Sequence, residues 1–417
     1  MTAVCFYFQV HQPRRVKRYR AFSIGQDREY FNEAGENNRN NRKILEKVAD
    51  KCYLPANYAL YDVLQQHPEF RFAFSFSGVF LDQLEEYAPH VLESFRKLIN
   101  TGRVEVLSET YHHSLAFLYS KEEFRRQVAL HARKVKILFG VEPRVFRNTE
   151  LIYSNEIGQE AEALGFDGIL AEGADHILGW RSANFVYRPK GAKRIKLLLK
   201  NYKLSDDIAF RFSSRDWSEW PLSAPKFANW ISEHNGNGDV VNLFMDYETF
   251  GEHQWEDTGI FNFLRALPGE ILKHPDNSFV TPSQAVKKFR AYDEIDAPHY
   301  VSWADIERDL SAWRGNPIQH DALKGVYELE SEVLASNDKK LIEDWRRLQT
   351  SDHFYYMCTK WFADGDVHKY FNPYDSPYDA FISYMNVLHD MRLRLDEVKA
   401  KKELLRDVVV PRQFAAV

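Results

Sequence analysis

Residues 241–253, VNLFMDYETFGEH, begin as an apolar run typical of a buried strand and end in charged and polar residues. Successive side chains of a strand point to opposite faces, so Asp246 and Glu248 are expected to share one face with Phe244. Two carboxylates at the end of a buried strand are costly unless hydrogen bonds or opposite charges satisfy them. The stretch therefore predicts either a structural polar network or a functional site at this strand end.

Other strand-like segments occur along the chain, and most of them precede a segment with helical periodicity. They read AVCFYFQV (3–10), FRFAFSFSG (70–78), RVEVLS (103–108), RVFRNTE (144–150), FDGILAEG (166–173), IKLLLKNYK (195–203) and NSFVTP (277–282). Short strands that alternate with longer helices indicate a parallel α/β sheet. The pattern by itself is compatible with an open doubly wound sheet or with a closed barrel.

The position of polar side chains favours the barrel. Gln9, Asn148, Glu150 and Glu172 lie at or near the carboxyl ends of strand-like segments, where an α/β barrel builds its active site. No GxGxxG or GxxxxGK[ST] pattern follows any of these segments, so the usual sign of nucleotide binding in an open sheet is absent. Residues 301–417 have mostly helical periodicity and are expected to form a helical domain packed on the barrel.

Capping signals predict two helix starts. Ser120 and Glu123 have the spacing of a capping box, and Gly140 is expected to end the helix that follows it. Thr281 and Pro282 are expected to be the N-cap and the first residue of a later helix.

The composition excludes several classes of protein. The formal net charge is −5 and no long basic run occurs, which argues against nucleic acid and anionic membranes as partners. No segment approaches the ~18 apolar residues that a membrane-spanning helix needs. The first residues lack the basic region and cleavage site of a signal peptide, and the three cysteines lie far apart without a CxxC pattern. We therefore expect a cytoplasmic protein with reduced thiols.

Aromatic residues make up 15% of the chain, with 30 Phe, 22 Tyr and 9 Trp. Flat apolar rings with polar edges suit either a large aromatic core or a carbohydrate ligand. Trp255 and Trp303 lie beside charged segments and are the better candidates for platforms on which sugars stack.

The carboxylates at strand ends suggest a specific chemistry. Asn148 and Glu150 alternate onto one face of RVFRNTE, so a barrel would bring Glu150 and the acids of residues 241–253 into one mouth. Glycoside hydrolysis uses such a pair: one carboxylate attacks the anomeric carbon or activates water, and the other, with a raised pKa, protonates the leaving oxygen. These acids could instead pair with Arg147 or other basic residues near the rim, and spacing alone does not decide between the two.

Histidines occur beyond the same strand-like segments, at His11, His112, His113 and His253. Together with carboxylates they could bind a metal, although no HExxH or HxH spacing is present. Neutral histidine also binds sugar hydroxyls. A sugar cleft without a metal is the favoured interpretation, so no metal and no other cofactor are expected.

With these residues placed, the chain resembles glycoside hydrolase family 57, a group of retaining enzymes active on α-glucans. Five segments carry the resemblance in order: VHQP (10–13), GRVEVLSETYHH (102–113), FRNTELIY (146–153), FMDYETFGEH (244–253) and LQTSDHFYYM (348–357). The resemblance implies an α/β fold, with an incomplete (β/α)7 TIM-like barrel in residues 1–300 and a C-terminal helical domain in residues 301–417.

Carried over to the matching positions, the resemblance implies that Glu150 is the nucleophile and Asp246 the general acid/base. It also implies that His11, His113 and Asp352 line the sugar subsites near the cleaved bond. The reaction would be a double displacement through a glycosyl-enzyme, with retention of configuration.

The expected function is α-amylase-type hydrolysis of α-1,4-glucans or maltooligosaccharides, with Glu248 orienting Asp246 or binding substrate. A 4-α-glucanotransferase or a branching enzyme would use the same two acids. Two alternatives come from other classes: a metal-dependent polysaccharide deacetylase with His11, His113 and a carboxylate as ligands, or a glucan-binding protein without turnover. The sequence predicts no oligomeric state.

Overall fold

The computed structural model describes residues 2–31, 39–360 and 372–409. The chain divides into two compact units. The first consists of Met1–Pro13 and Arg42–Leu310, and the second of Arg14–Asn41 and Ser311–Val417. The expected domains of residues 1–300 and 301–417, packed on each other, stay a prediction.

The first unit contains two sheets whose strands are almost all parallel. The strand order is β3-β2-β1-β8 in one sheet, where β9 also pairs with β1, and β10-β6-β7-β5-β4 in the other; only β6 and β7 are antiparallel to each other. The bounds are β1 Thr2–Val10, β2 Phe72–Phe76, β3 Val104–Val106, β4 Val145–Arg147, β5 Gly168–Glu172, β6 Val186–Pro189, β7 Lys196–Lys200, β8 Val240–Asp246, β9 Asn277–Phe279 and β10 Glu294–Ile295.

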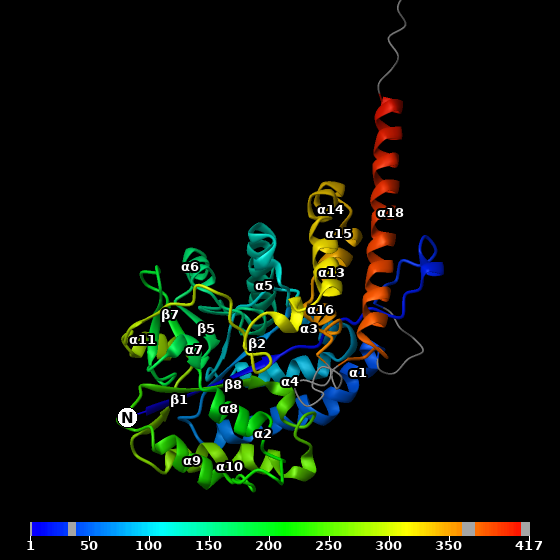
Figure 1. Cartoon of the computed structure of the whole chain (residues 1–417). Helices are drawn as coiled ribbons and strands as arrows, with labels where there is room; N and C mark the ends of the chain where they lie inside the picture. Colours follow the sequence, from blue (N-terminus) through cyan, green and yellow to red (C-terminus); the bar gives the residue numbers. More distant parts are fainter. Residues whose placement is uncertain (1, 32–38, 361–371, 410–417) are drawn as a thin grey trace, which may run out of the picture. The chain divides into compact units, whose positions relative to one another are not determined.

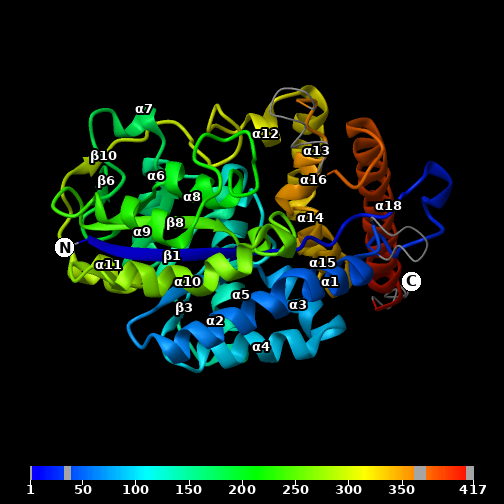
Figure 2. The ribbon, with the colours of Figure 1, turned by 90° about the horizontal axis from the view of Figure 1, so that it is seen from below.

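Short contacts join the two sheets at both of their shared edges. Ser108, just beyond β3, forms a bridge with Phe146 of β4. On the other side, the amide of Asn201, just beyond β7, donates to the carbonyl of Asn242 in β8 at 2.9 Å. The strands β8, β1, β2, β3, β4, β5 and β7 therefore form the incomplete (β/α)7 barrel that the sequence predicts (Figures 1 and 2).

Helices of the first unit follow the strands and cover the sheets. Their bounds are α1 Asn41–Val48, α2 Leu54–Gln66, α3 Gly78–Tyr87, α4 Pro89–Ile99, α5 Lys121–Phe139, α6 Asn155–Ala163, α7 Asp175–Leu178, α8 Tyr202–Ala209, α9 Ala224–Ser232, α10 Ile260–Leu272 and α11 Pro282–Lys288. Both capping predictions are confirmed: the Ser120 hydroxyl accepts from the Glu123 amide, and Thr281 forms a capping box at the start of α11. Gly140 ends α5 with φ 73°, a conformation that favours glycine.

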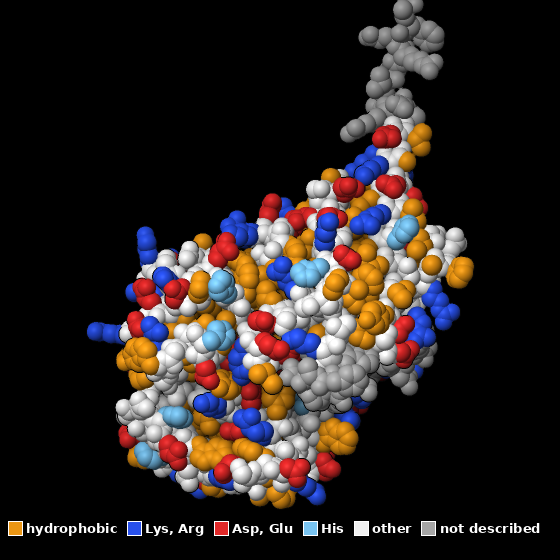
Figure 3. Space-filling model, viewed as in Figure 1, with side chains coloured by type: hydrophobic (Ala, Val, Ile, Leu, Met, Phe, Trp, Pro, Cys, Tyr) orange, Lys and Arg blue, Asp and Glu red, His pale blue; other side chains and the backbone are white. Residues whose placement is uncertain are grey.

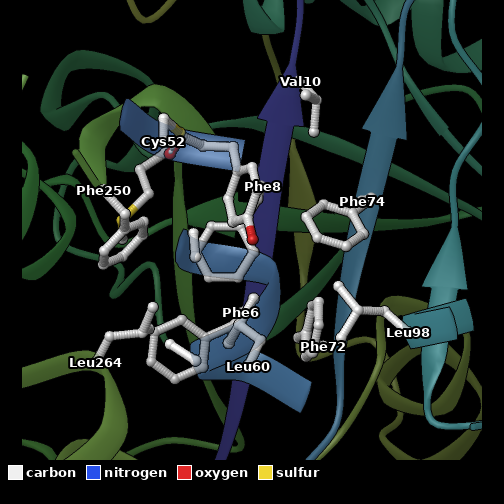
Figure 4. Packing of buried hydrophobic residues seen from close by; sticks show 14 of the residues in the cluster. Phe6, Phe8, Val10, Cys52, Leu60, Phe72, Phe74, Leu98, Phe250 and Leu264 are labelled. Atoms are coloured by element: carbon white, nitrogen blue, oxygen red, sulfur yellow. Dashed lines mark hydrogen bonds between the residues drawn. The ribbon is translucent and has the colours of Figure 1, made fainter. Parts of the chain in front are cut away.

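The two faces of β1 show how the core is built. Val4, Phe6, Phe8 and Val10 face the surrounding helices, where they pack with aromatic residues of β2 such as Phe74 (Figure 4). The alternate residues face the barrel interior and are smaller or polar: Ala3, Cys5, Tyr7 and Gln9. Much of the high aromatic content is thus explained by this outer core rather than by ligand binding.

The second unit is helical. Its helices are α12 Ser311–Arg314, α13 Pro317–Tyr327, α14 Glu330–Ser336, α15 Lys339–Arg347, α16 Ser351–Tyr355 and α18 Pro377–Val409. Trp345 of α15 is fully buried, and its indole N–H donates to the carbonyl of Val326 at 2.7 Å. Arg394 of α18 pairs with the buried carboxylate of Asp344 at 2.8 Å. The C-terminal helical character expected from periodicity is therefore confirmed.

The surface carries charges of both signs. On the face shown in Figure 3, acidic and basic side chains are interspersed rather than collected in a broad patch of one sign. Within the part of the chain that the structure describes, no helix has the length and apolar character needed to cross a bilayer.

Candidate active site

Polar side chains of three neighbouring strands lie at the same level of the barrel. Asp246, the last residue of β8, is opposite Gln9 of β1, and Gln9 is opposite Ser75 of β2. Gln9 and Ser75 both donate to a carboxylate oxygen of Glu109, at 3.0 and 2.6 Å. The carboxyl ends of these strands thus place Asp246 and Glu109 around a shared polar interior.

Glu150 is presented by a strained turn. Strand β4 ends at Arg147, so Glu150 does not reach the site by strand alternation, as RVFRNTE had suggested. Instead, Glu150 and Leu151 both have positive φ, 58° and 50°, which side-chain-bearing residues rarely adopt. Strain of this kind is retained where the surroundings hold it, and it occurs often at functional sites. The Glu150 side chain is 21% exposed, so its carboxylate is accessible to a ligand.

His113 bridges two carboxylates. Its Nδ1 lies 3.2 Å from Glu109 Oε1 and its Nε2 lies 3.1 Å from Glu150 Oε1. Burial would lower the pKa of His113, but these hydrogen bonds and the two negative charges raise it to about 9. Burial likewise opposes ionisation of Glu109, yet the hydrogen bond and charge of His113 lower the pKa of Glu109 to about 2. At neutral pH the bridge is a cation between two carboxylates, and both ring N–H groups donate.

The pKa of Asp246 is raised, whereas that of Glu109 is lowered. Burial and the nearby negative charge of Glu150 raise the pKa of Asp246 to about 6, against the lowering effect of the Arg147 charge. A carboxyl group with such a pKa can hold a proton close to neutral pH and release it readily. Asp246 is therefore suited to proton transfer, whereas Glu150 accepts a hydrogen bond from the cationic imidazole of His113.

Glu248 is separated from Asp246 by a change in backbone structure. The strand ends at Asp246 and residues Tyr247–Thr249 form a single helical turn, so the expectation that alternation puts both acids on one face is wrong. The carboxylate of Glu248 is buried and accepts a hydrogen bond of 2.5 Å from the hydroxyl of Tyr53. Burial and the negative charge of Asp246 raise the pKa of Glu248 to about 8. Through its hydrogen bond with Tyr53, Glu248 supports the turn that follows Asp246.

Trp303 contacts Glu150 with both its side chain and its backbone. The indole Nε1 donates to Glu150 Oε2 at 2.8 Å, and the Trp303 amide donates to the Glu150 carbonyl at 3.3 Å. The charged end of Arg147 lies 5.0 Å from the centre of the indole ring. The guanidinium nitrogens of Arg147 make no hydrogen bond to any described residue, so the alternative that Glu150 or Asp246 is neutralised by a direct Arg147 pair is not realised.

His11 and His113 stack face to face, with ring centres 4.0 Å apart and planes 19° apart. His11 Nδ1 is also 2.6 Å from the hydroxyl of Ser77. Because both ring nitrogens of His113 are engaged by carboxylates, a metal could bind His113 only by displacing Glu109 or Glu150.

Two further predicted residues are Trp255 and Asp352. Trp255, on the loop after β8, is 57% exposed and borders a groove of about 560 Å³ together with Asp50, Lys51 and Asp257. Asp352 lies in α16 of the second unit, and its part in a sugar subsite stays a prediction.

The contacts of three residues of the site were not predicted from the sequence. Glu109 lies in the segment GRVEVLSETYHH, but only the fold shows that its carboxylate contacts His113. Arg147 was considered only as a possible ion-pair partner of the acids. Tyr53 carried no signal, because it reaches the site from an element whose packing cannot be read from sequence.

Comparison with known proteins identifies the family. Residues 5–298 match the sequence profile described as Glycosyl hydrolase family 57. A protein of Methanocaldococcus jannaschii named "Putative alpha-amylase" is 42% identical over 412 residues, which cover 96% of this chain and 86% of that protein.

Two solved structures share the fold at low sequence identity. A branching enzyme from Pyrococcus horikoshii matches with a TM-score of 0.66 at 15% identity, over 100% of this chain and 98% of that one. A 4-alpha-glucanotransferase from Thermococcus litoralis matches with a TM-score of 0.57 at 18% identity, over 89% of this chain and 54% of that one. The profile match and the 42% identity together show that this chain belongs to glycosyl hydrolase family 57 and is a glycoside hydrolase.

Proposed function

We propose that the protein is a retaining, α-amylase-type hydrolase that cleaves α-1,4-glucans or maltooligosaccharides by double displacement. The observation that carries this proposal is the contrast between two neighbouring acids. Glu150 accepts hydrogen bonds from cationic His113 and from Trp303, which favours its charged form, whereas the pKa of Asp246 is raised to about 6. A retaining glycosidase needs one carboxylate and one proton donor in this relation.

In the first step, the Asp246 carboxyl group donates its proton to the glycosidic oxygen, and the bond from this oxygen to the anomeric carbon breaks. A carboxylate oxygen of Glu150 attacks the anomeric carbon from the opposite face and forms the glycosyl-enzyme. As Glu150 loses its negative charge, the carboxylic acid form of Asp246 becomes harder to maintain, because the Glu150 charge is one cause of its raised pKa. Asp246 is thereby prepared for its next role as a base.

In the second step, the Asp246 carboxylate takes a proton from a water molecule, which attacks the anomeric carbon and releases Glu150. Two inversions leave the configuration of the sugar unchanged. Throughout the cycle, Glu109 holds the imidazolium of His113 in place and balances its charge when Glu150 is esterified. Glu248, hydrogen bonded to Tyr53, supports the segment that carries Asp246.

Sugar contacts are proposed for the other predicted residues. His11, stacked on His113, borders the subsite nearest the cleaved bond. The exposed indole of Trp255 offers an apolar face to an outer part of the glucan chain. A sugar contact is also proposed for Asp352. We also propose that the enzyme works in the cytoplasm, on a glucan or oligosaccharide, without a metal or other cofactor.

Transfer to a second sugar is the alternative within the same mechanism. If an acceptor hydroxyl replaces water in the second step, the enzyme becomes a 4-α-glucanotransferase or a branching enzyme. The similar structures of the 4-alpha-glucanotransferase from Thermococcus litoralis and the branching enzyme from Pyrococcus horikoshii support keeping this alternative.

The test is incubation with maltoheptaose followed by sizing of the products. Hydrolysis gives only sugars shorter than the substrate, whereas transfer also gives longer ones. Glu150→Gln and Asp246→Asn are the matched inactive variants, because each keeps the shape of the side chain and removes its acid function. Unchanged maltoheptaose with the wild-type enzyme, or loss of its activity on treatment with a chelator, would contradict the proposal and direct attention to glucan binding or to metal-dependent deacetylation.

A further inference from the structure

Arg147 is a buried cation that the proposed mechanism does not use. It is the last residue of β4, three positions before Glu150, and its side chain is 0% exposed. None of its three guanidinium nitrogens has a hydrogen-bond partner among the residues that the structure describes. A buried charge without hydrogen bonds is among the most costly groups in a protein interior, so its presence requires a compensating function.

The contact that Arg147 does make leads to the nucleophile. Its guanidinium carbon lies 5.0 Å from the ring centre of Trp303, which is within the range of a cation–π interaction. The same indole donates its N–H to Glu150 Oε2 at 2.8 Å, while the Trp303 backbone donates to the Glu150 carbonyl. Arg147 therefore contacts the face of the Trp303 indole, and the N–H at the edge of the same indole donates to one carboxylate oxygen of Glu150.

The charges around this contact are consistent with such a role. The positive charge of the guanidinium lowers the pKa of two carboxyl groups, Glu109 beyond β3 and Asp246 at the end of β8. Lys200 of β7 is a second cation near the same indole, at 5.4 Å, but its ammonium group is hydrogen bonded to Asp206. Arg147 is thus the cation near Trp303 whose hydrogen-bonding groups are not engaged by the protein.

We propose that Arg147 is a positioning residue for the nucleophile: it packs against the indole of Trp303 and keeps the Trp303 N–H directed at Glu150. Glu150 then has each oxygen held by a separate donor, one from His113 and one from Trp303. Because the turn that carries Glu150 is strained, with φ 58°, its carboxylate needs such external support to stay in line with the anomeric carbon. This inference rests on the proposed function, in which Glu150 is the nucleophile.

A double-mutant cycle tests the proposal on maltoheptaose. Arg147→Met is expected to lower kcat by about tenfold and to leave KM within about twofold, because the residue supports the reacting group and not substrate binding. Arg147→Lys keeps the charge but loses the planar stack, and is expected to lower kcat in the same direction with an unchanged melting temperature. The double variant Arg147→Met/Trp303→Phe should be no slower than Trp303→Phe alone, since both changes remove the same support.

Arg181→Met is the matched control. Arg181 also lies over an indole, at 5.4 Å from the ring centre of Trp180, but that ring is 76% exposed and touches neither catalytic acid. Its kcat should equal that of the wild type. Multiplicative losses in the double variant, a loss that appears in KM, or a wild-type kcat for Arg147→Lys would each overturn the proposal. If Arg147→Met does not fold, Arg147→Lys and its double variant with Trp303→Phe provide the same cycle.

A second readout does not depend on turnover. In protein labelled with ¹⁵N-tryptophan, the indole N–H signal of Trp303 is identified by its loss in Trp303→Phe. Arg147→Lys is expected to shift or broaden that signal, whereas Arg181→Met leaves it unchanged. An unmoved Trp303 signal refutes the inference about Arg147, while an inactive wild-type enzyme with a shifted signal refutes the proposed function instead.

Discussion

The ion bridge of His113 with Glu109 and Glu150 is expected to stabilise the folded protein in a pH-dependent way. His113→Gln removes the imidazolium between Glu109 and Glu150 and leaves Glu109 as a buried carboxylate without its cation. The pKa of His113 in the folded protein, about 9, is higher than its ordinary value of 6.5. A raised histidine pKa means that protonation favours the fold: the stabilisation is complete below pH 6.5 and is lost as pH rises through 9.

The structure sets the size of the effect. A pKa raised from 6.5 to about 9 corresponds to about 3 kcal/mol of folding free energy at pH 6. Because His113 and Glu109 are both buried, solvent does not weaken this interaction in the way it weakens surface pairs. The lowered pKa of Glu109 expresses the same interaction from its other partner and adds nothing further.

Urea unfolding of the wild type and of His113→Gln at pH 6 and at pH 10 measures the effect. The difference between the two proteins is expected to be about 3 kcal/mol larger at pH 6 than at pH 10. His253→Gln is the control, because burial lowers the pKa of His253 to about 4 and this histidine is neutral at both pH values. A destabilisation by His113→Gln that is the same at both pH values would refute the assignment of a cationic bridge.

Three further predictions concern the acids and the backbone. Trp303→Phe removes the N–H that Glu150 accepts, and kcat in steady-state assays should fall about ten- to hundredfold, as expected for a hydrogen bond to a charged group; an unchanged kcat would contradict the geometry. Asp246 must be protonated to act as the acid, and its pKa is raised to about 6. The value of kcat/KM should therefore decline as pH rises through about 6. A decline that begins only above about pH 8 would argue against Asp246 as the acid. Gly251→Ala should lower the free energy of unfolding, measured by calorimetry, by more than about 3 kcal/mol. Gly251 has φ 115°, and an added methyl group would lie 1.9 Å from a backbone oxygen. Gly102→Ala is the control: Gly102 has φ 72° with open space around it, so this change should cost only about 1 kcal/mol.

Much of the fold could be predicted because its signals are local. Strand β1 was expected at residues 3–10 and spans Thr2–Val10, and the caps at Ser120 and Thr281 are hydrogen bonds between residues close in sequence. Strand β6 was missed, since Val186–Pro189 is short, contains a proline and is antiparallel to β7, unlike its neighbours. Such a strand is defined by its partner and not by its own pattern.

The candidate site shows the same limit. The sequence supplied Glu150 and Asp246 through their motifs, but strand alternation led to the wrong geometry for Glu150 and Glu248. Both residues lie in short helical turns beyond the last residue of their strands, where the alternation of strand side chains no longer applies.

By itself, the sequence determined which side chains were available at the carboxyl ends of the strands, because motif order and alternation are properties of the chain. Only the tertiary structure decided how they differ in chemistry. Glu150 and Asp246 are both simple carboxylic acids, and their protonation depends on burial and on charges from other strands: His113 beyond β3, Arg147 in β4 and each other. Electrostatic effects of this kind act over a few ångströms in space between residues that are far apart in sequence, so no reading of the chain alone could assign them.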